Sequence, residues 1–197
     1  MQIIVTGTPG TGKTVIARAV AKKLGYTLIE IKKIVDTNKS LYKIKKSTNR
    51  FLTVKERDFF NIEKGERIVD VDKLKKAIIK ELEKPKNNII IEGHLACEMH
   101  LPAKFVFVLR CNPKILRKRL QKRKYPKEKI DENLLAEMLD YCTQLARKNY
   151  KKPKIIELDT AKRNLNKCVV EIINVIKGKK KKIDDVDYNK ELIKHLI

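Results

Sequence analysis

A glycine-rich stretch near the start of the chain has the residue types and spacing of a phosphate-binding loop. Residues 7–14 read GTPGTGKT, which fits the P-loop pattern G-x-x-x-x-G-K-[ST]. Glycines allow the backbone N–H groups to approach phosphate closely, and the N-terminus of a following helix adds its own unpaired N–H groups. In this pattern Lys13 contacts the β- and γ-phosphates, and the Thr14 hydroxyl binds Mg²⁺. An ordinary Gly/Pro turn is the weaker interpretation, because strand, loop and helix occur in the order that the motif requires.

A carboxylate and a histidine form a second candidate group. Glu92 ends an apolar run, where phosphoryl-transfer enzymes of this type place an acid near the metal. Aspartate is usual there, and the longer glutamate can act through a water molecule. His94 follows two residues later, where it could orient a water or an accepting phosphate. The alternatives are that Glu92 only caps a strand and that His94 is a structural loop residue.

Three arginines are candidates for neutralising the charge of the transferred phosphoryl group. Arg117 and Arg119 belong to a predicted helix, where so dense a basic run is usually a solvated face. Arg123 differs, because it opens a charged connector, 122–131, with the composition of a hinged lid. Such a lid closes over the triphosphate and excludes water.

An alternation of strands and helices must position these residues. The expected strands are 2–6, 26–31, 88–92, 105–110 and 155–158, and the expected helices are 13–24, 72–84, 113–121, one long helix through Leu134 to Leu145, and 165–177. Several strands are continuous apolar runs, as in parallel sheets covered on both faces. We therefore predict an α/β fold with a five-stranded parallel sheet and nucleotide at the carboxyl ends of the strands. Residues 32–68 read as an insert with a short helix or two, and 178–197 as a basic amphipathic tail.

Composition limits the setting in which the protein works. The 197 residues suit a single domain, and 47 Lys and Arg against 24 Asp and Glu give a formal charge of +23. Such a charge attracts polyanions such as nucleic acid, although a generally lysine-rich background explains it equally well. No apolar run reaches about 18 residues, so we expect no membrane span. Met1 leads directly into a strand and the four cysteines match no metal or disulfide pattern, so we expect a cytoplasmic protein with free thiols.

Four segments together carry a resemblance to a known family. They are GTPGTGKT at 7–14, Glu-Gly-His at 92–94, FVLR at 107–110 and LQKRKY at 120–125. In this combination the chain resembles the adenylate kinase isoenzyme six family, also called CINAP, whose members act in ribosome maturation and include archaeal proteins. The likeness covers residues 1 to about 177, and the Glu-x-His segment and the FVLR strand are more specific than the P-loop.

The resemblance implies roles for individual residues. The ATP phosphates would be bound by Gly10, Gly12, Lys13, Thr14 and Val15. Glu92 takes the place of the metal-associated aspartate, and His94 that of a histidine needed for activity. Arg123 matches the lid arginine, and Lys162 matches a lysine of the adenine-side loop. Thr14 and Glu92 would hold Mg²⁺, within a P-loop kinase core that carries a monophosphate-binding arm at about 30–68 and a short lid at about 122–132.

The resemblance also implies an activity, with a departure on the acceptor side. Family members convert ATP and AMP to two ADP, hydrolyse ATP, and bind a small-subunit ribosomal protein during late processing of pre-ribosomal RNA. Here Lys32-Lys33 replace a usual Gly-Asp pair, and Asp36 falls about where the family has an arginine. Arg50, Arg57 or Arg67 could hold the acceptor phosphate instead. The alternatives are an ATP-hydrolysing assembly switch with little or no monophosphate kinase activity, and a small P-loop kinase with another acceptor.

Overall fold

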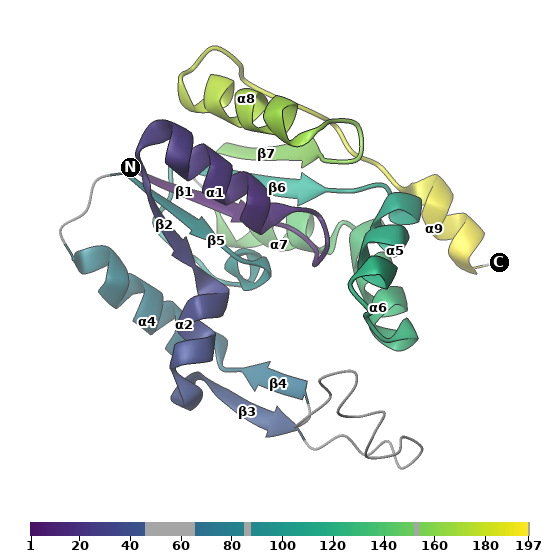
Figure 1. Cartoon of the computed structure of the whole chain (residues 1–197), viewed down its shortest axis with the longest axis horizontal. Helices are drawn as coiled ribbons and strands as arrows, with labels where there is room; N and C mark the ends of the chain where they lie inside the picture. The colour runs from purple at the N-terminus through teal and green to yellow at the C-terminus, as the bar shows by residue number, and fades with distance from the viewer. Residues whose placement is uncertain (46–65, 85–87, 152–153, 197) are drawn as a thin grey trace.

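A five-stranded parallel sheet forms the centre of the protein, as the sequence predicts (Figure 1). The computed structural model describes residues 1–45, 66–84, 88–151 and 154–196. The strands are β1 (Gln2–Thr6), β2 (Thr27–Glu30), β5 (Ile89–Glu92), β6 (Phe105–Arg110) and β7 (Lys154–Asp159), in the order β2-β5-β1-β6-β7. Because all five run in the same direction, their carboxyl ends and the loops that follow them meet at one edge.

Helices cover both faces of this sheet, which confirms the predicted fold class. Alternate residues of β1 enter different cores: Ile3 and Val5 pack with α1 (Lys13–Leu24) and α8 (Leu165–Ile176). Ile4 faces the other core, which is built from the following elements: α2 (Ile31–Thr37), α4 (Val71–Glu83), the 3₁₀ helix η2 (His94–Glu98) and α7 (Tyr141–Asn149). Burial on both faces explains why β5 and β6 are apolar almost throughout.

A third cluster lies beside the carboxyl edge of the sheet. It joins α5 (Pro113–Lys122) and α6 (Lys127–Met138) with Tyr188, which leads into α9 (Asn189–Leu196). The segment predicted as the lid, 122–132, consists of the end of α5, a short turn and the first half of α6. No helix of the described residues is long and apolar enough to cross a membrane.

The prediction of one long helix through Leu134 to Leu145 is wrong, because the chain breaks between α6 and α7. Asp140 adopts a left-handed φ of 54° at the break. The Arg110 guanidinium forms an ion pair with the Asp140 carboxylate, and its Nη2 donates to the Glu137 carbonyl at 2.9 Å. That carbonyl is one that a continuing helix would have used for its own hydrogen bond.

The segment after β2 contains short helices, as predicted, but also a pair of strands that was not predicted. The strand ends at Glu30 and α2 begins at once, followed by η1 (Lys39–Leu41) and an antiparallel pair, β3 (Tyr42–Lys45) and β4 (Glu66–Val69). This pair has exposed residues such as Ile44 and Ile68, so no buried face imposes an alternating pattern on its sequence. Asp70 caps α4 by accepting from the Lys73 N–H. Arg50 and Arg57 lie outside the described residues.

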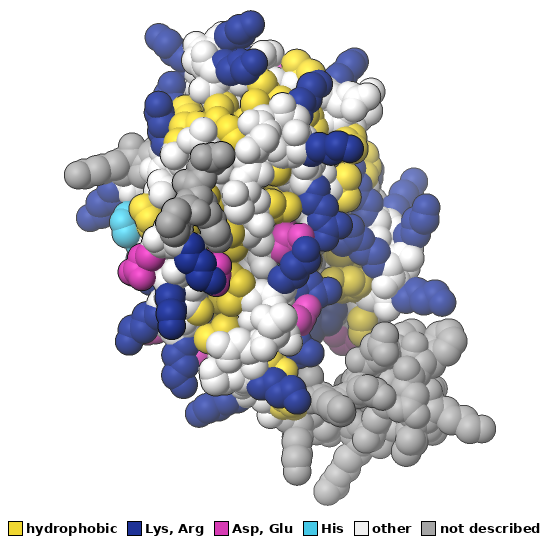
Figure 2. Space-filling model, turned by 60° about the vertical axis from the view of Figure 1, so that its left-hand side comes forward, with side chains coloured by type: hydrophobic (Ala, Val, Ile, Leu, Met, Phe, Trp, Pro, Cys, Tyr) yellow, Lys and Arg dark blue, Asp and Glu magenta, His cyan; other side chains and the backbone are white. Residues whose placement is uncertain are grey.

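Basic side chains are spread over the surface. In Figure 2 Lys and Arg are scattered over the whole visible face, with few acidic side chains between them. The positive charge of this face is therefore not confined to one stripe.

Candidate active site

The glycine-rich loop is folded tightly against the strand and helix beside it. Gly7 has a φ of +135°, and a Cβ there would lie 2.2 Å from the backbone oxygen of Leu109 in β6. A Cβ on Gly10 would lie 2.7 Å from the Leu116 side chain of α5. Only glycine fits these two positions, so the loop backbone is held at the carboxyl ends of β1 and β6.

Lys13 is buried beneath this loop. Its side chain is 8% exposed, and its Nζ donates to the Thr8 carbonyl at 3.0 Å. Burial lowers the pKa of Lys13, while the nearby Cys142 thiol and the carboxylates of Glu92 and Glu137 oppose that shift. An ammonium held this way is desolvated and can exchange its carbonyl partner for a phosphate oxygen.

Glu92 lies next to Lys13 and Thr14, as the sequence suggested. Burial raises the pKa of the Glu92 carboxyl, while the Lys13 charge and a hydrogen bond with the Thr14 side chain oppose this. A hydroxyl and a carboxylate together fit the preference of Mg²⁺ for a few protein oxygens, with phosphates and waters as the other ligands. Within the described ranges no three or more His, Cys, Asp and Glu residues group as metal ligands. The Thr14 hydroxyl and the Glu92 carboxylate could supply two of those protein oxygens.

Glu30 is a second carboxylate at this edge, and it was not predicted as a site residue. Glu30 is paired in register with Glu92 across β2 and β5, and its carboxylate accepts from Arg18 at 2.6 Å and forms an ion pair with Lys33 at 2.7 Å. Burial alone would raise the pKa of Glu30, but hydrogen bonds from Arg18 and Lys33 lower it overall. The sequence did contain a signal for Glu30, because it is an acid at the last position of a strand next to β5.

A pocket of about 500 Å³ opens on one side of the P-loop, and we call it the nucleotide pocket. It contains four residues that the sequence assigned to ATP, namely Gly10, Gly12, Val15 and Arg123. The remaining lining residues are Thr11, Ile16, Arg119, Lys122, Thr160, Arg163, Leu165 and Cys168.

Two arginines of the nucleotide pocket are fixed by hydrogen bonds. Arg119 donates to the Thr160 hydroxyl at 3.0 Å and to the Thr160 carbonyl at 3.1 Å. Arg163 is held by Asp184 from the C-terminal tail. Lys162 does not line this pocket. Its ammonium lies 3.5 Å from the Asp159 carboxylate, and the neighbouring Arg163 occupies the wall instead.

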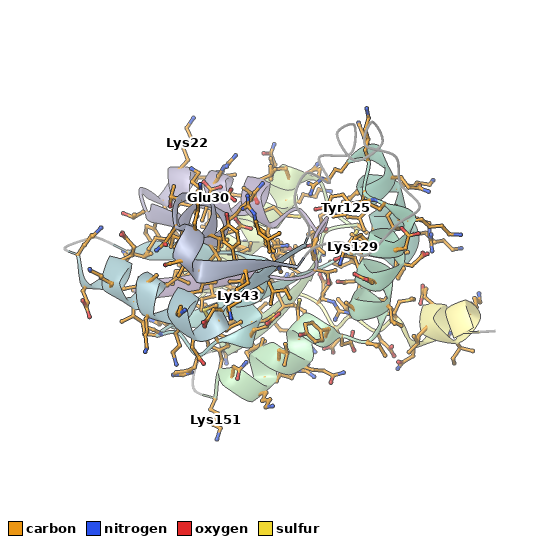
Figure 3. All side chains as sticks on the ribbon, turned by 90° about the horizontal axis from the view of Figure 1, so that it is seen from below. Lys22, Glu30, Lys43, Tyr125, Lys129 and Lys151 are labelled. Atoms are coloured by element: carbon orange, nitrogen blue, oxygen red, sulfur yellow. The ribbon has the colours of Figure 1, made fainter. Side chains whose placement is uncertain are left out.

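A second pocket, of about 370 Å³, lies on the other side of the P-loop, and we call it the acceptor pocket. It is lined by Thr8, Pro9, His94, Glu98, Tyr125, Lys129, Glu132, Asn133, Ala136, Tyr141 and Cys142. Figure 3 shows Tyr125 and Lys129 at the side of the α5–α6 pair that faces the sheet. The P-loop therefore separates a pocket rich in arginine from one that carries charges of both signs.

His94 is anchored by its backbone and uncharged at its side chain. Its carbonyl accepts from the Thr6 hydroxyl and the Cys97 thiol, both at 3.1 Å. Burial within the pocket and the Lys13 charge lower the pKa of His94 to about 4. His94 as a whole is exposed even though neighbouring groups crowd its ring, and the direction of the shift alone leaves the imidazole neutral at pH 7.

A buried ionic network is centred on Arg110. Arg110, the last residue of β6, is ion-paired with Glu137 at 2.9 Å, with Glu157 at 2.6 Å and with Asp140. Burial alone would lower the pKa of Arg110, but Glu137 and Asp140 raise it overall. Arg110 is therefore a structural residue that joins β6 and β7 to the helices of the lid region.

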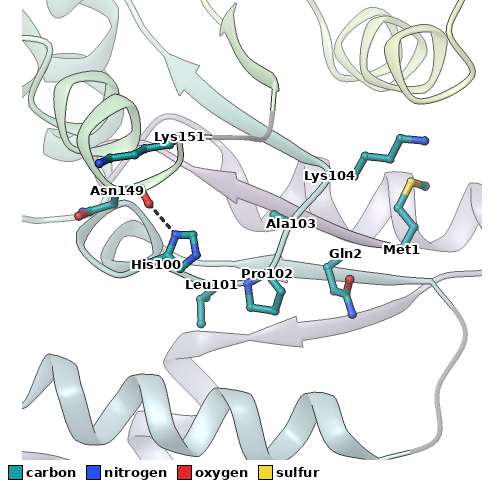
Figure 4. Close-up of a pocket in the computed structure, with 9 residues that line it drawn as sticks. All are labelled: Met1, Gln2, His100, Leu101, Pro102, Ala103, Lys104, Asn149 and Lys151. Carbon is teal, nitrogen blue, oxygen red and sulfur yellow. Dashed lines mark hydrogen bonds between the residues drawn. The ribbon is translucent and has the colours of Figure 1, made fainter.

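A further cavity lies at the opposite edge of the sheet. It measures about 880 Å³ and is lined by residues at the amino ends of β1 and β6, including Gln2 and Lys104. Figure 4 shows Lys104 and Lys151 pointing away from each other, while His100 contacts the Asn149 carbonyl at 2.6 Å. No convergent set of reactive groups lines it, so the P-loop edge is the better candidate for chemistry.

Solved structures with a similar fold include two small-molecule kinases. Shikimate kinase from Acinetobacter baumannii aligns with a TM-score of 0.59 at 17% identity, over 91% of this chain and 94% of that one. Deoxyadenosine kinase from M. mycoides aligns with a TM-score of 0.57 at 21% identity, over 91% and 100%. At these identities the likeness establishes the fold alone.

Sequence relatives are closer and cover the whole chain. The family model described as "AAA domain" matches residues 3–140. A protein named "Putative adenylate kinase" from Methanocaldococcus jannaschii is 36% identical over 196 residues, covering 100% of this chain and 97% of the relative. A protein of the same name from Pyrococcus abyssi is also 36% identical, with the same coverage. The chain therefore belongs to the archaeal "Putative adenylate kinase" family of P-loop proteins.

Proposed function

We propose that this protein transfers the γ-phosphoryl group of Mg²⁺-bound ATP to AMP, giving two ADP. The observation that carries the proposal is that two pockets adjoin the P-loop that contains Lys13 and Thr14: one is lined by Gly10, Gly12 and Val15, and the other by Thr8 and Pro9. One pocket contains the residues expected at ATP, and the other contains His94. Phosphoryl transfer needs this arrangement, because donor and acceptor must approach the moving group from opposite sides.

Each residue has a defined task in this mechanism. Thr14 and Glu92 would hold a Mg²⁺ ion, which would supply neutralisation of the phosphate charge. Lys13 leaves the Thr8 carbonyl, 3.0 Å away, for the phosphate oxygens. Arg123, at the end of α5, adds positive charge from the nucleotide pocket. The neutral His94 orients the acceptor phosphate, or a water in its place, by hydrogen bonding.

The experiment is a coupled assay of ADP formation from ATP with a panel of nucleoside monophosphates. AMP should raise ADP formation well above the rate with ATP alone. Equal rates with every monophosphate and with none would leave hydrolysis as the only reaction. Stimulation by a different monophosphate, and not by AMP, would assign another acceptor to the same site.

A second candidate function is an ATP-driven switch in small-subunit ribosome assembly, in which slow hydrolysis releases the protein from its partner. The charge of +23 and the substituted acceptor arm support it. The described arm offers Arg67, whose guanidinium already pairs with Asp36 at 2.6 Å and lies over the Tyr42 ring. Binding to pre-ribosomal RNA would be strongly salt-dependent. The test is enrichment of a ribosomal protein from native lysate that differs between ADP and a non-hydrolysable ATP analogue.

A further inference from the structure

The C-terminal tail reaches the nucleotide pocket. After α8 the chain passes along the exposed edge of β7 and ends in α9 beside α6 (Figure 1). Asp184 forms an antiparallel bridge with Glu157, in which its N–H donates to the Glu157 carbonyl at 3.2 Å. Tyr188 then packs against Arg110, with the guanidinium 5.3 Å from the ring centre. The tail is therefore fixed in register on the last strand of the sheet.

Asp184 binds two groups of the loop that closes the nucleotide pocket. Its Oδ1 accepts from Arg163 Nη2 at 2.8 Å, and its Oδ2 accepts from Arg163 Nη1 at 2.6 Å. The same Oδ2 also accepts from the Asp159 N–H at 2.8 Å. The Arg163 and Asp184 side chains are only 17% and 11% exposed, so the bidentate pair is shielded from solvent.

Arg163 in turn lines the nucleotide pocket, together with Val15 and Leu165. Its Nη1 also donates to the Asp159 carbonyl at 3.2 Å, which leaves the guanidinium little freedom to turn. The loop that contains it is tied to the P-loop, because the Thr160 hydroxyl donates to the Thr11 carbonyl at 2.9 Å. The tail thus determines the position of a planar cation in the wall of this pocket, and Lys13 is not among the residues that line it.

We propose that Asp184 is a positioning residue for nucleotide recognition: it fixes Arg163 against the base and ribose end of ATP, so the tail beyond the kinase core contributes to the affinity and selectivity for ATP. This inference rests on the proposed function, since it takes the nucleotide pocket as the ATP site. The proposal divides the binding of ATP into two contributions. The P-loop binds phosphates, and the Asp184–Arg163 pair acts on the part of ATP that inorganic tripolyphosphate lacks.

The experiment measures dissociation constants of ATP and of inorganic tripolyphosphate, each with Mg²⁺, for the wild type and for Asp184→Asn. A hydrogen-bonded charge pair of this kind predicts that ATP binds roughly tenfold more weakly to the variant. Tripolyphosphate affinity should stay the same. Asp185→Asn is the matched control, because this neighbouring acid carries the same charge, is 81% exposed and pairs only with Lys182 among the contacts described. It should bind both probes as the wild type does.

A second variant separates recognition from folding. Arg163→Lys keeps the charge but loses the bidentate geometry, so it should reproduce the selective loss of ATP affinity. Thermal unfolding without nucleotide shows whether each variant is folded. Equal weakening of both probes, or no weakening of ATP binding in either variant, would overturn the inference. Failure of the wild type to bind either probe would instead overturn the proposed function, and this inference with it.

Discussion

The two sides of the P-loop are built differently. On the nucleotide side, Arg119 and Arg163 are held by backbone groups and by one carboxylate, so their guanidinium groups are already in place. On the acceptor side, the described part of the predicted monophosphate arm offers Arg67, which pairs with the exposed Asp36 at 2.6 Å. Arg18 of α1 pairs with Glu30, at the edge of the sheet, at 2.6 Å. Neither arginine lines the acceptor pocket. The nucleotide side is therefore preorganised, whereas an acceptor phosphate must compete with carboxylates.

This difference indicates how the two substrates would bind. Exposed ion pairs contribute only about 0–1 kcal/mol each, so a phosphate dianion can displace Asp36 from Arg67 at little cost. The buried network around Arg110 is different, since removing one partner leaves charges without compensation in the interior. Variants at these positions should show a graded series of effects.

The largest effect is expected at the buried ion pairs of Arg110. Arg110→Met leaves Glu137 and Glu157 buried without their cation, which should lower the free energy of unfolding by about 3–5 kcal/mol. Urea denaturation measures this loss. Arg147→Met is the control, because Arg147 lies 3.8 Å from Glu157 but is 65% exposed, and its loss should cost under about 1 kcal/mol. Equal losses in the two variants would remove the distinction between buried and exposed pairs.

Lys13→Ala tests the role of the P-loop lysine in phosphoryl transfer. Removing a charge that stabilises the transferred phosphoryl group should lower kcat by about 100-fold or more. The fold should survive, because the Lys13 ammonium contacts only a loop carbonyl in the described structure. Lys22→Ala, on the exposed last turn of the same helix, should keep normal turnover. Turnover near the wild-type rate in Lys13→Ala would refute the P-loop assignment.

His94 tests the acceptor side alone. His94→Ala should lower kcat by about tenfold, as expected for the loss of one orienting hydrogen bond, and should change ATP affinity much less. His94→Gln keeps a neutral hydrogen-bonding side chain and should retain more activity than His94→Ala. Steady-state kinetics and equilibrium binding separate the two effects. If ATP binding is lost while turnover of bound ATP is unchanged, His94 is a structural residue.

The pH dependence follows from the lowered pKa of His94. With a pKa of about 4 rather than 6.5, the imidazole is already neutral above pH 6. A reaction that uses the neutral ring keeps its kcat as the pH falls from 8 to 6 and loses it only as the ring becomes protonated near the lowered pKa. The kcat profiles of the wild type and His94→Gln should therefore run parallel over this range. A rise of wild-type kcat below pH 6.5 that His94→Gln lacks would mean that the imidazolium is the active form.

The smallest effect is expected on the acceptor arm. Asp36→Asn releases Arg67, and if this cation binds the acceptor phosphate, the KM for the monophosphate should fall by about threefold, in line with the weak exposed pair. Arg67→Gln should raise the same KM. The KM for ATP should not change in either variant. A change in the KM for ATP, with none for the monophosphate, would mean that the arm binds ATP and not the acceptor.

The central fold could be predicted because its signals are local. The P-loop glycines, the apolar strands and the helical periodicity each reflect one element in its own environment. The break at Asp140 could not be predicted, since it depends on Arg110, about 30 residues away in sequence, which draws on the Glu137 carbonyl. The β3–β4 pair was also missed, because its exposed residues follow no pattern set by burial.

The candidate site also contains both residues that could be predicted from local sequence and residues that could not. Lys13, Thr14 and Glu92 follow from a motif and a strand end, and the structure places them together. Glu30 and Arg163 were not singled out, since their positions depend on pairing between strands and on a tail that folds back across the sheet. Lys162 was assigned one position away from the residue that lines the pocket, which is the usual uncertainty for a loop without periodicity.

The fate of the γ-phosphoryl group tests the two-sided site most directly. ATP labelled at its γ-phosphate is incubated with the protein and Mg²⁺, with and without AMP, and the products are separated. A donor pocket and an acceptor pocket that both adjoin the P-loop predict that with AMP the label appears in the β-phosphate of ADP, and that little is released as inorganic phosphate. Label that appears only as inorganic phosphate, at a rate that AMP does not change, would contradict this account.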